Sequence, residues 1–134
     1  MTPLRSETLP VREPSDMFLV RQLVRECAAD LGFGLLDQTK LMTAASELGR
    51  NTLIHGGGGT MLLETFVNND RRGLRLTFKD TGPGIPDIEQ AMSDGFTSKD
   101  GMGLGLGGSR RLVDEFEVVS RVGEGTRVTV MRWT

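Results

Sequence analysis

The stretch that decides the fold of this chain is Leu74-Arg75-Leu76-Thr77-Phe78-Lys79-Asp80-Thr81-Gly82-Pro83-Gly84-Ile85. Apolar and polar side chains alternate over residues 73–80, which predicts a β-strand with one face against a core. The alternation places Asp80 on the same face as the apolar side chains of that strand. The strand therefore ends in a core-facing carboxylate, and a glycine-rich loop follows at once.

A carboxylate that faces a core needs a hydrogen-bond donor, because burying an unpaired charge is costly. The neighbouring sequence offers no obvious cation, whereas the exocyclic amine of a bound purine would supply a donor. Gly82 and Gly84 would let a flat ring approach the backbone closely. The alternative is a strand-ending turn in which the Asp80 side chain bonds to its own backbone. This motif alone leaves both interpretations open.

The residues before this strand predict two strands and two helices. An edge strand is expected at 7–12, a helix from Ser15, a second helix at 37–55, and a strand at 60–67 with a turn at 68–70. The apolar stripe of the first helix consists of Met17, Val20, Val24, Cys27 and Leu31. That of the second consists of Leu41, Ala45, Leu48 and Thr52, and the glycines at 56–59 end it.

The residues after the strand predict a loop at 81–86 and a short helix near 87–93. A glycine-rich stretch to residue 108, a helix ending near Phe116 and a hairpin of strands at 117–122 and 126–133 follow. These elements predict one domain, residues 1–134, with an α/β (α+β) two-layer sandwich fold. Its sheet is expected to be mixed, mainly antiparallel, and covered by helices on one face.

Composition excludes several classes of function. The chain has 134 residues, 37% of them hydrophobic, which suits a single globular domain. A net charge of −2, no Tyr and one Trp argue against a nucleic-acid partner. The single cysteine, Cys27, is expected to be a small core residue. No apolar run is long enough for a signal peptide or a membrane span, so we expect a cytoplasmic protein with no membrane partner.

A first candidate site lies in Ser46-Glu47-Leu48-Gly49-Arg50-Asn51. A spacing of four places Glu47 and Asn51 on one helical face, with His55 one turn further along. A carboxylate beside an amide oxygen suits a general base next to a magnesium ligand. The alternative is a solvated helix face. His55 alone is more typical of a structural histidine than of a catalytic one.

A second candidate site is the run Gly101-Met102-Gly103-Leu104-Gly105-Leu106-Gly107-Gly108-Ser109, which leads into a helix. Exposed amides in such a loop can bind phosphate oxygens, and we expect residues 94–108 to form a lid. A Rossmann fingerprint is disfavoured because a polar loop, and not a strand, precedes the glycines. No Walker motif is present. A flexible surface loop is the alternative.

In this order, the acidic-amide helix, the D-x-G-x-G loop and the G-x-G-x-G segment resemble the N, G1 and G2 boxes of the GHKL, or Bergerat-fold, ATPases. The pair Gly125-Thr126 resembles the late Gly-Thr of that family. The resemblance implies ATP and Mg²⁺ as cofactors, Asn51 as the magnesium ligand, and Glu47 as the residue that activates the acceptor. Arg50 would contact the transferred phosphoryl group or an acid of the partner. The resemblance implies nucleotide contacts at Asn51, Asp80, Gly82, Gly84, Ile85, Gly101, Gly103, Leu104, Gly105, Leu106, Gly107 and Thr126.

Within that superfamily, residues 43–51, 94–98, 112–116 and 131–133 resemble the RsbT-type serine/threonine switch kinases. The resemblance implies a kinase that phosphorylates a STAS-domain antagonist or scaffold protein. When released, such a kinase binds and activates a PP2C-type phosphatase regulator.

The main alternative is an anti-sigma factor kinase of the RsbW type, which sequesters a sigma factor. A sensor histidine kinase is disfavoured, because the chain has no room for a phosphoacceptor hairpin. A nucleotide-binding adaptor without turnover is disfavoured because Glu47 and Asn51 are both present.

Overall fold

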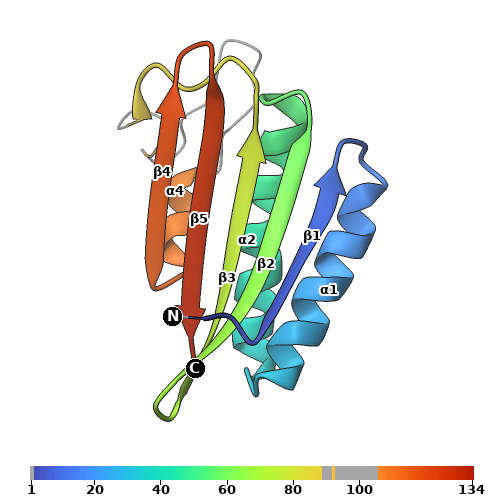
Figure 1. Ribbon diagram of the computed structural model, residues 1–134, viewed down its shortest axis with the longest axis vertical. Coiled ribbons are helices and arrows are strands. Elements are labelled where there is room, and N and C mark those ends of the chain that lie inside the picture. The colour runs from blue at the N-terminus through green and yellow to red at the C-terminus, as the bar shows by residue number, and fades with distance from the viewer. Residues whose placement is uncertain (1, 89–91, 93–105) are drawn as a thin grey trace.

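The computed structural model describes residues 2–88, 92 and 106–134 of the chain. A five-stranded sheet forms one layer and the helices lie against one of its faces (Figure 1). The strand order is β1-β2-β3-β5-β4. The elements are β1 (Arg5–Val11), α1 (Asp16–Asp30), α2 (Leu35–Ile54), β2 (Gly59–Asn68), β3 (Arg71–Asp80), α4 (Leu106–Arg111), β4 (Glu115–Arg121) and β5 (Gly125–Trp133).

The expected sandwich with helices on one face is confirmed. A mixed, mainly antiparallel sheet was expected, and all four strand pairings among the described residues are antiparallel. The strand expected at 7–12 is β1, which lies at the sheet edge and so tolerates Pro10. Among the described residues, no helix is long and apolar enough to cross a membrane.

The β2–β3 hairpin confirms the predicted strands and turn. Asn68 pairs with Arg71, so the connection has two residues, and Asn69 takes a positive φ of 57°. Asparagine tolerates this left-handed conformation better than most residues with a side chain. The register sets Met61 opposite Phe78, which aligns the buried faces of the two strands.

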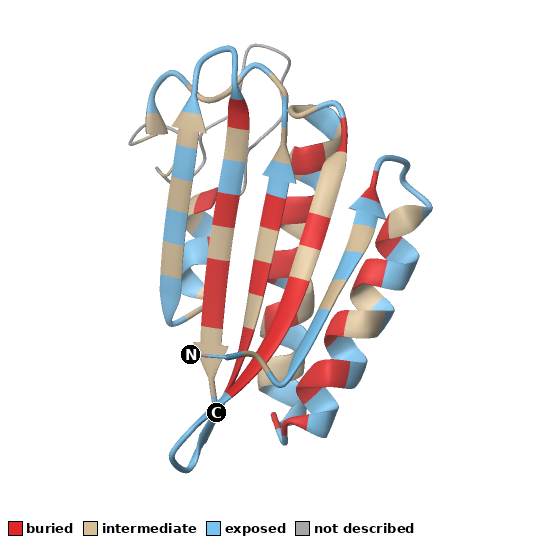
Figure 2. Cartoon of the chain, viewed as in Figure 1, coloured by how far each residue is buried: buried red, intermediate tan, exposed pale blue. Residues whose placement is uncertain are grey.

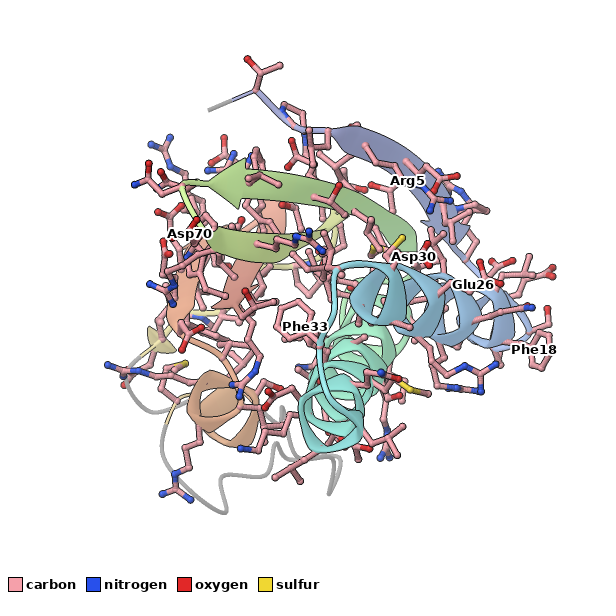
Figure 3. The ribbon with its side chains drawn as sticks, turned by 90° about the horizontal axis from the view of Figure 1, so that it is seen from below. Arg5, Phe18, Glu26, Asp30, Phe33 and Asp70 are labelled. Atoms are coloured by element: carbon pink, nitrogen blue, oxygen red, sulfur yellow. The ribbon has the colours of Figure 1, made fainter. Side chains whose placement is uncertain are left out.

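The core lies between the sheet and the inner faces of α1 and α2, where buried residues follow one stripe on each helix (Figure 2). Both predicted stripes are confirmed as buried. Cys27 is 1% exposed, and burial raises the pKa of its thiol. Phe33, on the connection between α1 and α2, lies between the sheet and α2 and closes the lower end of the core (Figure 3).

The first helix begins as predicted after Ser15, but the neighbouring residue supplies the side-chain bonds. The Asp16 carboxylate accepts hydrogen bonds from the backbone N–H groups of Arg12 at 2.9 Å and Glu13 at 3.0 Å. These two bonds favour the ionised form and lower the pKa of Asp16. The carboxylate thereby orders the loop that joins β1 to α1.

The prediction of a helix ending near Phe116 is wrong. The helix α4 ends at Arg111, and Phe116 lies in β4 opposite Val130. The Asp114 backbone N–H donates to the Met131 carbonyl, so pairing with β5 begins before the expected helix end. Of the short helix expected at 87–93, only residues 87, 88 and 92 are among the described residues.

Arg132 ties three parts of the chain together. Its Nη2 atom lies 2.6 Å from Asp37 Oδ1 in the first turn of α2, and its Nη1 donates to the Leu112 carbonyl at 2.8 Å. The arginine side chain is only 16% exposed, so water screens these contacts weakly. The segment that follows α4 is thus fixed to α2 and β5.

We predict that Arg132→Met lowers the free energy of unfolding by about 1–2 kcal/mol, because charge-assisted bonds are lost and Asp37 loses its partner. Urea unfolding measures this change. The control is Arg121→Met, whose pair with Glu124 spans 3.9 Å between exposed side chains and should change stability by less than about 0.5 kcal/mol. Equal effects of the two substitutions would contradict the role of Arg132.

Candidate nucleotide site

A cavity of about 290 Å³ lies between the C-terminal part of α2, the last residues of β3 and the first residues of β5. This volume is close to the lower end of the range for small-molecule sites, about 300–1,000 Å³. Its wall is mainly apolar, with a few polar groups, as is usual in such sites. It consists of Leu48, Asn51, Thr52, His55, Phe78, Asp80, Gly84, Ile85, Pro86, Asp87, Leu106, Thr126 and Val128.

The Asp80 carboxylate stands at the end of β3 on the face predicted from strand parity. It is half-buried, and its Oδ1 atom accepts hydrogen bonds from the backbone N–H groups of Gly82 at 2.9 Å and Thr126 at 3.2 Å. The side chain bonds to its own loop, as the turn interpretation expects, and it also faces the cavity, as the purine interpretation requires. Both bonds go to Oδ1, which leaves Oδ2 as an acceptor for a further donor.

Gly56 makes this placement of Asp80 possible. A Cβ atom at position 56 would overlap the Asp80 carboxylate, so only glycine lets the end of α2 approach β3 this closely. Gly82 packs on the backbone of Gly56, which extends the same close contact. From the sequence, Gly56 was expected only to end the helix. Its contact with Asp80 could not be predicted, because the two residues lie far apart in the chain.

The loop after Asp80 is anchored to the β4–β5 hairpin. The Ile85 backbone N–H donates to Ser120 Oγ at 2.7 Å, and the Gly123 N–H donates to the Pro83 carbonyl at 2.8 Å. Gly84 has a φ of 79°, and a Cβ there would overlap the Arg121 carbonyl. Gly84 and Ile85 are therefore held at fixed positions on the cavity wall.

The Thr126 hydroxyl is oriented by Ser120, which sequence reasoning did not single out. The two hydroxyl oxygens are 2.8 Å apart, and Ser120 Oγ also contacts the Gly125 carbonyl at 3.2 Å. If Ser120 donates to that carbonyl, Thr126 must donate to Ser120 and keeps only acceptor capacity towards the cavity. The cross-strand pairing of Ser120 with Thr126 was the available signal, but it depends on knowing the register.

The helix α2 carries the remaining candidate site residues, one after another along its axis. Asn51 lies on the cavity wall, with His55 one turn after it. Glu47 is half-buried one turn before Asn51 and is not part of the wall, while Arg50 is exposed. Among the described residues, no group of three His, Cys, Asp or Glu side chains could hold a metal alone. A magnesium ion at Asn51 would therefore need phosphate oxygens and water as its other ligands.

The glycine-rich segment is described only in part. Leu106, the first residue of α4, is 2% exposed and lies on the cavity wall, and Gly107 follows it. Four of the predicted nucleotide-contact residues, Gly101, Gly103, Leu104 and Gly105, lie outside the described residues. Gly82 lies beside Asp80 but does not line the cavity.

Comparison with known proteins identifies the family. Residues 36–133 match the family described as "Histidine kinase-, DNA gyrase B-, and HSP90-like ATPase". The chain is 44% identical over 118 residues to the serine/threonine-protein kinase RsbT of Bacillus subtilis strain 168, covering 88% of this chain and 89% of the relative. It is 31% identical over 119 residues to the anti-sigma F factor of Thermoanaerobacter sp. strain X514, covering 84% and 82%.

Solved structures show the same fold. The crystal structure of the RsbU and RsbW domains of a Mycobacterium tuberculosis protein aligns with a TM-score of 0.64 at 22% identity, over 98% of this chain and 32% of that longer one. The catalytic domain of the histidine kinase ThkA aligns with a TM-score of 0.55 at 18% identity, over 96% and 95%.

The chain belongs to the histidine kinase-, DNA gyrase B- and HSP90-like ATPase family. Within that family, the predicted resemblance to the RsbT-type switch kinases and the predicted enzyme class, an ATP-dependent serine/threonine protein kinase, are confirmed.

The residues of the cavity fit an adenine nucleotide. Oδ2 of Asp80 can accept from an amine, and the Thr126 hydroxyl lies on the same wall. The buried Nε2 atom of His55 has no partner within the described part of the chain, so the wall also offers an unused polar atom.

We predict that Asp80→Asn lowers ADP affinity about tenfold or more. An asparagine can keep its oxygen at the Oδ1 position for the two backbone donors, but it presents an amide N–H₂ where Oδ2 would accept from adenine. Titration calorimetry measures the affinity, and thermal unfolding tests whether the fold is kept. Unchanged ADP affinity in a folded variant would remove Asp80 from the site.

Proposed function

We propose that this kinase uses Mg-ATP to phosphorylate a serine or threonine of a STAS-domain antagonist or scaffold protein. When released from that partner, it binds and activates a PP2C-type phosphatase regulator. The proposal is supported by the 44% identity to RsbT together with the cavity at the end of α2. A switch between these two partners takes place in the cytoplasm, and that location is part of the proposal.

The single observation that carries the proposal is the order of side chains along α2. Asn51 faces the cavity, while Glu47 is half-buried and outside its wall. One helical turn, a rise of about 6 Å, separates the two residues. A carboxylate one turn away from the cavity wall supports a role towards a hydroxyl that a separate protein brings from outside.

Each residue then has a distinct task. Asp80 would bind the adenine amine through Oδ2, and Asn51 would hold magnesium through its amide oxygen. Glu47 would orient the acceptor hydroxyl or take its proton. When bound, ATP would supply the phosphoryl group, and the magnesium ion would neutralise charge on its phosphate oxygens. Arg50, exposed beside Asn51, would contact the phosphoryl group or an acid of the partner.

The second candidate function is an anti-sigma factor kinase that sequesters a sigma factor and phosphorylates its anti-anti-sigma factor. The 31% identity to an anti-sigma F factor over most of both chains favours it. Both functions use the same nucleotide chemistry, so partner choice separates them. Stable capture of purified sigma factor would support sequestration, and capture of purified STAS protein without sigma factor would support the switch kinase.

We predict that Glu47→Ala and Asn51→Ala fail in different ways. Asn51→Ala should weaken magnesium-dependent nucleotide binding and abolish phosphoryl transfer. Glu47→Ala should keep Mg-ATP and partner binding while transfer falls by about 10²- to 10⁴-fold, because positioning of the acceptor is lost. Single-turnover transfer from radiolabelled ATP to STAS proteins encoded beside this gene measures both.

The control is Glu26→Ala, which removes an exposed carboxylate from α1, away from the cavity wall. It should transfer phosphate at the wild-type rate. A wild-type rate for Glu47→Ala would show that the proposed role of this carboxylate is wrong.

A further inference from the structure

Ser120 lies on β4 behind the cavity wall, and its hydroxyl contacts three groups that shape the cavity. Its Oγ atom accepts a hydrogen bond from the Ile85 backbone N–H at 2.7 Å. The same oxygen lies 3.2 Å from the Gly125 carbonyl and 2.8 Å from the Thr126 hydroxyl. Because Ile85 and Thr126 both line the cavity, one residue holds two parts of its wall.

The supply of protons decides how the two hydroxyls are oriented. Ser120 has one proton to donate, and the Gly125 carbonyl and the Thr126 oxygen both lie within reach of it. If the proton goes to Gly125, Thr126 donates to Ser120, and all three contacts of Ser120 are hydrogen bonds. If the proton goes to Thr126, the contact with the carbonyl of the buried Gly125 is not a hydrogen bond. The first arrangement is favoured because it makes one more hydrogen bond with the same atoms.

This arrangement fixes the chemical character of the wall beside Asp80. The Thr126 hydroxyl has used its proton, so it offers only lone pairs to the cavity. The Thr126 backbone N–H donates to Asp80 Oδ1 at 3.2 Å, which places the two residues next to each other. Since Oδ2 of Asp80 is an acceptor as well, two neighbouring side chains of the wall accept hydrogen bonds and neither donates one.

A wall of acceptors discriminates between purine bases. Adenine carries an amine at C6, which donates hydrogen bonds, whereas hypoxanthine and guanine carry a carbonyl oxygen there, which accepts them. An acceptor of the wall that faces a carbonyl oxygen loses its bond to water without gaining a donor, and an amine avoids this penalty.

We propose that Ser120 is a positioning residue for base selection, which holds the Thr126 hydroxyl as an acceptor and so favours adenine nucleotides over 6-oxopurine nucleotides. The inference rests on the proposed function, since it takes Asp80 as the ligand of the base. Ser120 is not part of the cavity wall, so it acts through Thr126.

Calorimetric titrations with ADP and with inosine diphosphate (IDP), whose base is hypoxanthine, measure the preference as the ratio of the two dissociation constants. Ser120→Ala frees the Thr126 proton, which can then donate to a carbonyl oxygen in the cavity. The preference for ADP should fall about threefold to tenfold. Loss of the hydrogen bond from Ile85 weakens both nucleotides alike and leaves the ratio unchanged.

The control is Val118→Ala, which shortens a half-buried side chain on the same face of β4 and removes no hydrogen-bonding group. It should keep the wild-type preference for ADP. A fall in the preference as large as that of Ser120→Ala would overturn the proposal, because the effect would then come from a weakened strand.

A second background tests whether Ser120 acts through Thr126. Thr126→Val keeps a side chain of similar shape and removes the hydroxyl acceptor, so it should weaken ADP without weakening IDP. Adding Ser120→Ala to Thr126→Val should then leave the preference unchanged.

Three further results would overturn the proposal. The first is a wild-type preference in Ser120→Ala, and the second is an equal fall in the preference with and without the Thr126 hydroxyl. The third is an equal loss of ADP and IDP affinity in Thr126→Val, which would show that the hydroxyl does not select the base. This third comparison needs no Ser120 variant, so the proposal can fail even if Ser120→Ala does not fold.

The outcome for the wild-type protein separates this inference from the proposed function. If the wild-type protein binds neither ADP nor IDP, the proposed function fails and the inference fails with it. If Asp80→Asn weakens ADP while Ser120→Ala keeps the wild-type preference, only the role of Ser120 is wrong.

Discussion

The fold and the site depend on one carboxylate oxygen, Asp80 Oδ1. It receives one hydrogen bond from the loop that follows β3 and one from the start of β5. The same side chain leaves no room for a Cβ at position 56, where α2 ends. A helix, a strand end and a second strand therefore meet at a single group. Because Oδ1 accepts the two structural hydrogen bonds, Oδ2 is left as an acceptor for a further donor.

The helix α2 serves the core and the site with the same face. Leu41, Ala45 and Leu48 pack against the sheet, and the continuation of that stripe reaches the cavity at Thr52 and His55. The position of Asn51 is thus set by a long row of buried contacts and not by a surface loop. Glu47 lies off this stripe, which explains why it is half-buried and reachable from outside the cavity.

Local periodicity predicted most of the fold, because helix stripes and strand alternation depend on neighbours in the sequence. It placed Asp80 with Phe78 on the correct face. It failed at Phe116, where pairing with Val130 overrides a helical pattern. It could not predict the approach of Gly56 to Asp80 or the hydrogen bond between Ser120 and Thr126, since each depends on residues distant in the sequence. Nor could it predict that His55 Nε2 is buried without a partner among the described residues.

The place of β5 in the sheet has a consequence for synthesis on the ribosome. It is the last strand in chain order, yet it lies between β3 and β4 in the interior of the sheet. Until its residues leave the exit tunnel, the nascent chain exposes β3 as an edge with unpaired backbone groups, which is a template for wrong strand pairing. The cavity also lacks Thr126 and Val128 at that stage. The cavity is therefore complete only after β5 has been synthesised, and nucleotide can bind the full site only from that point.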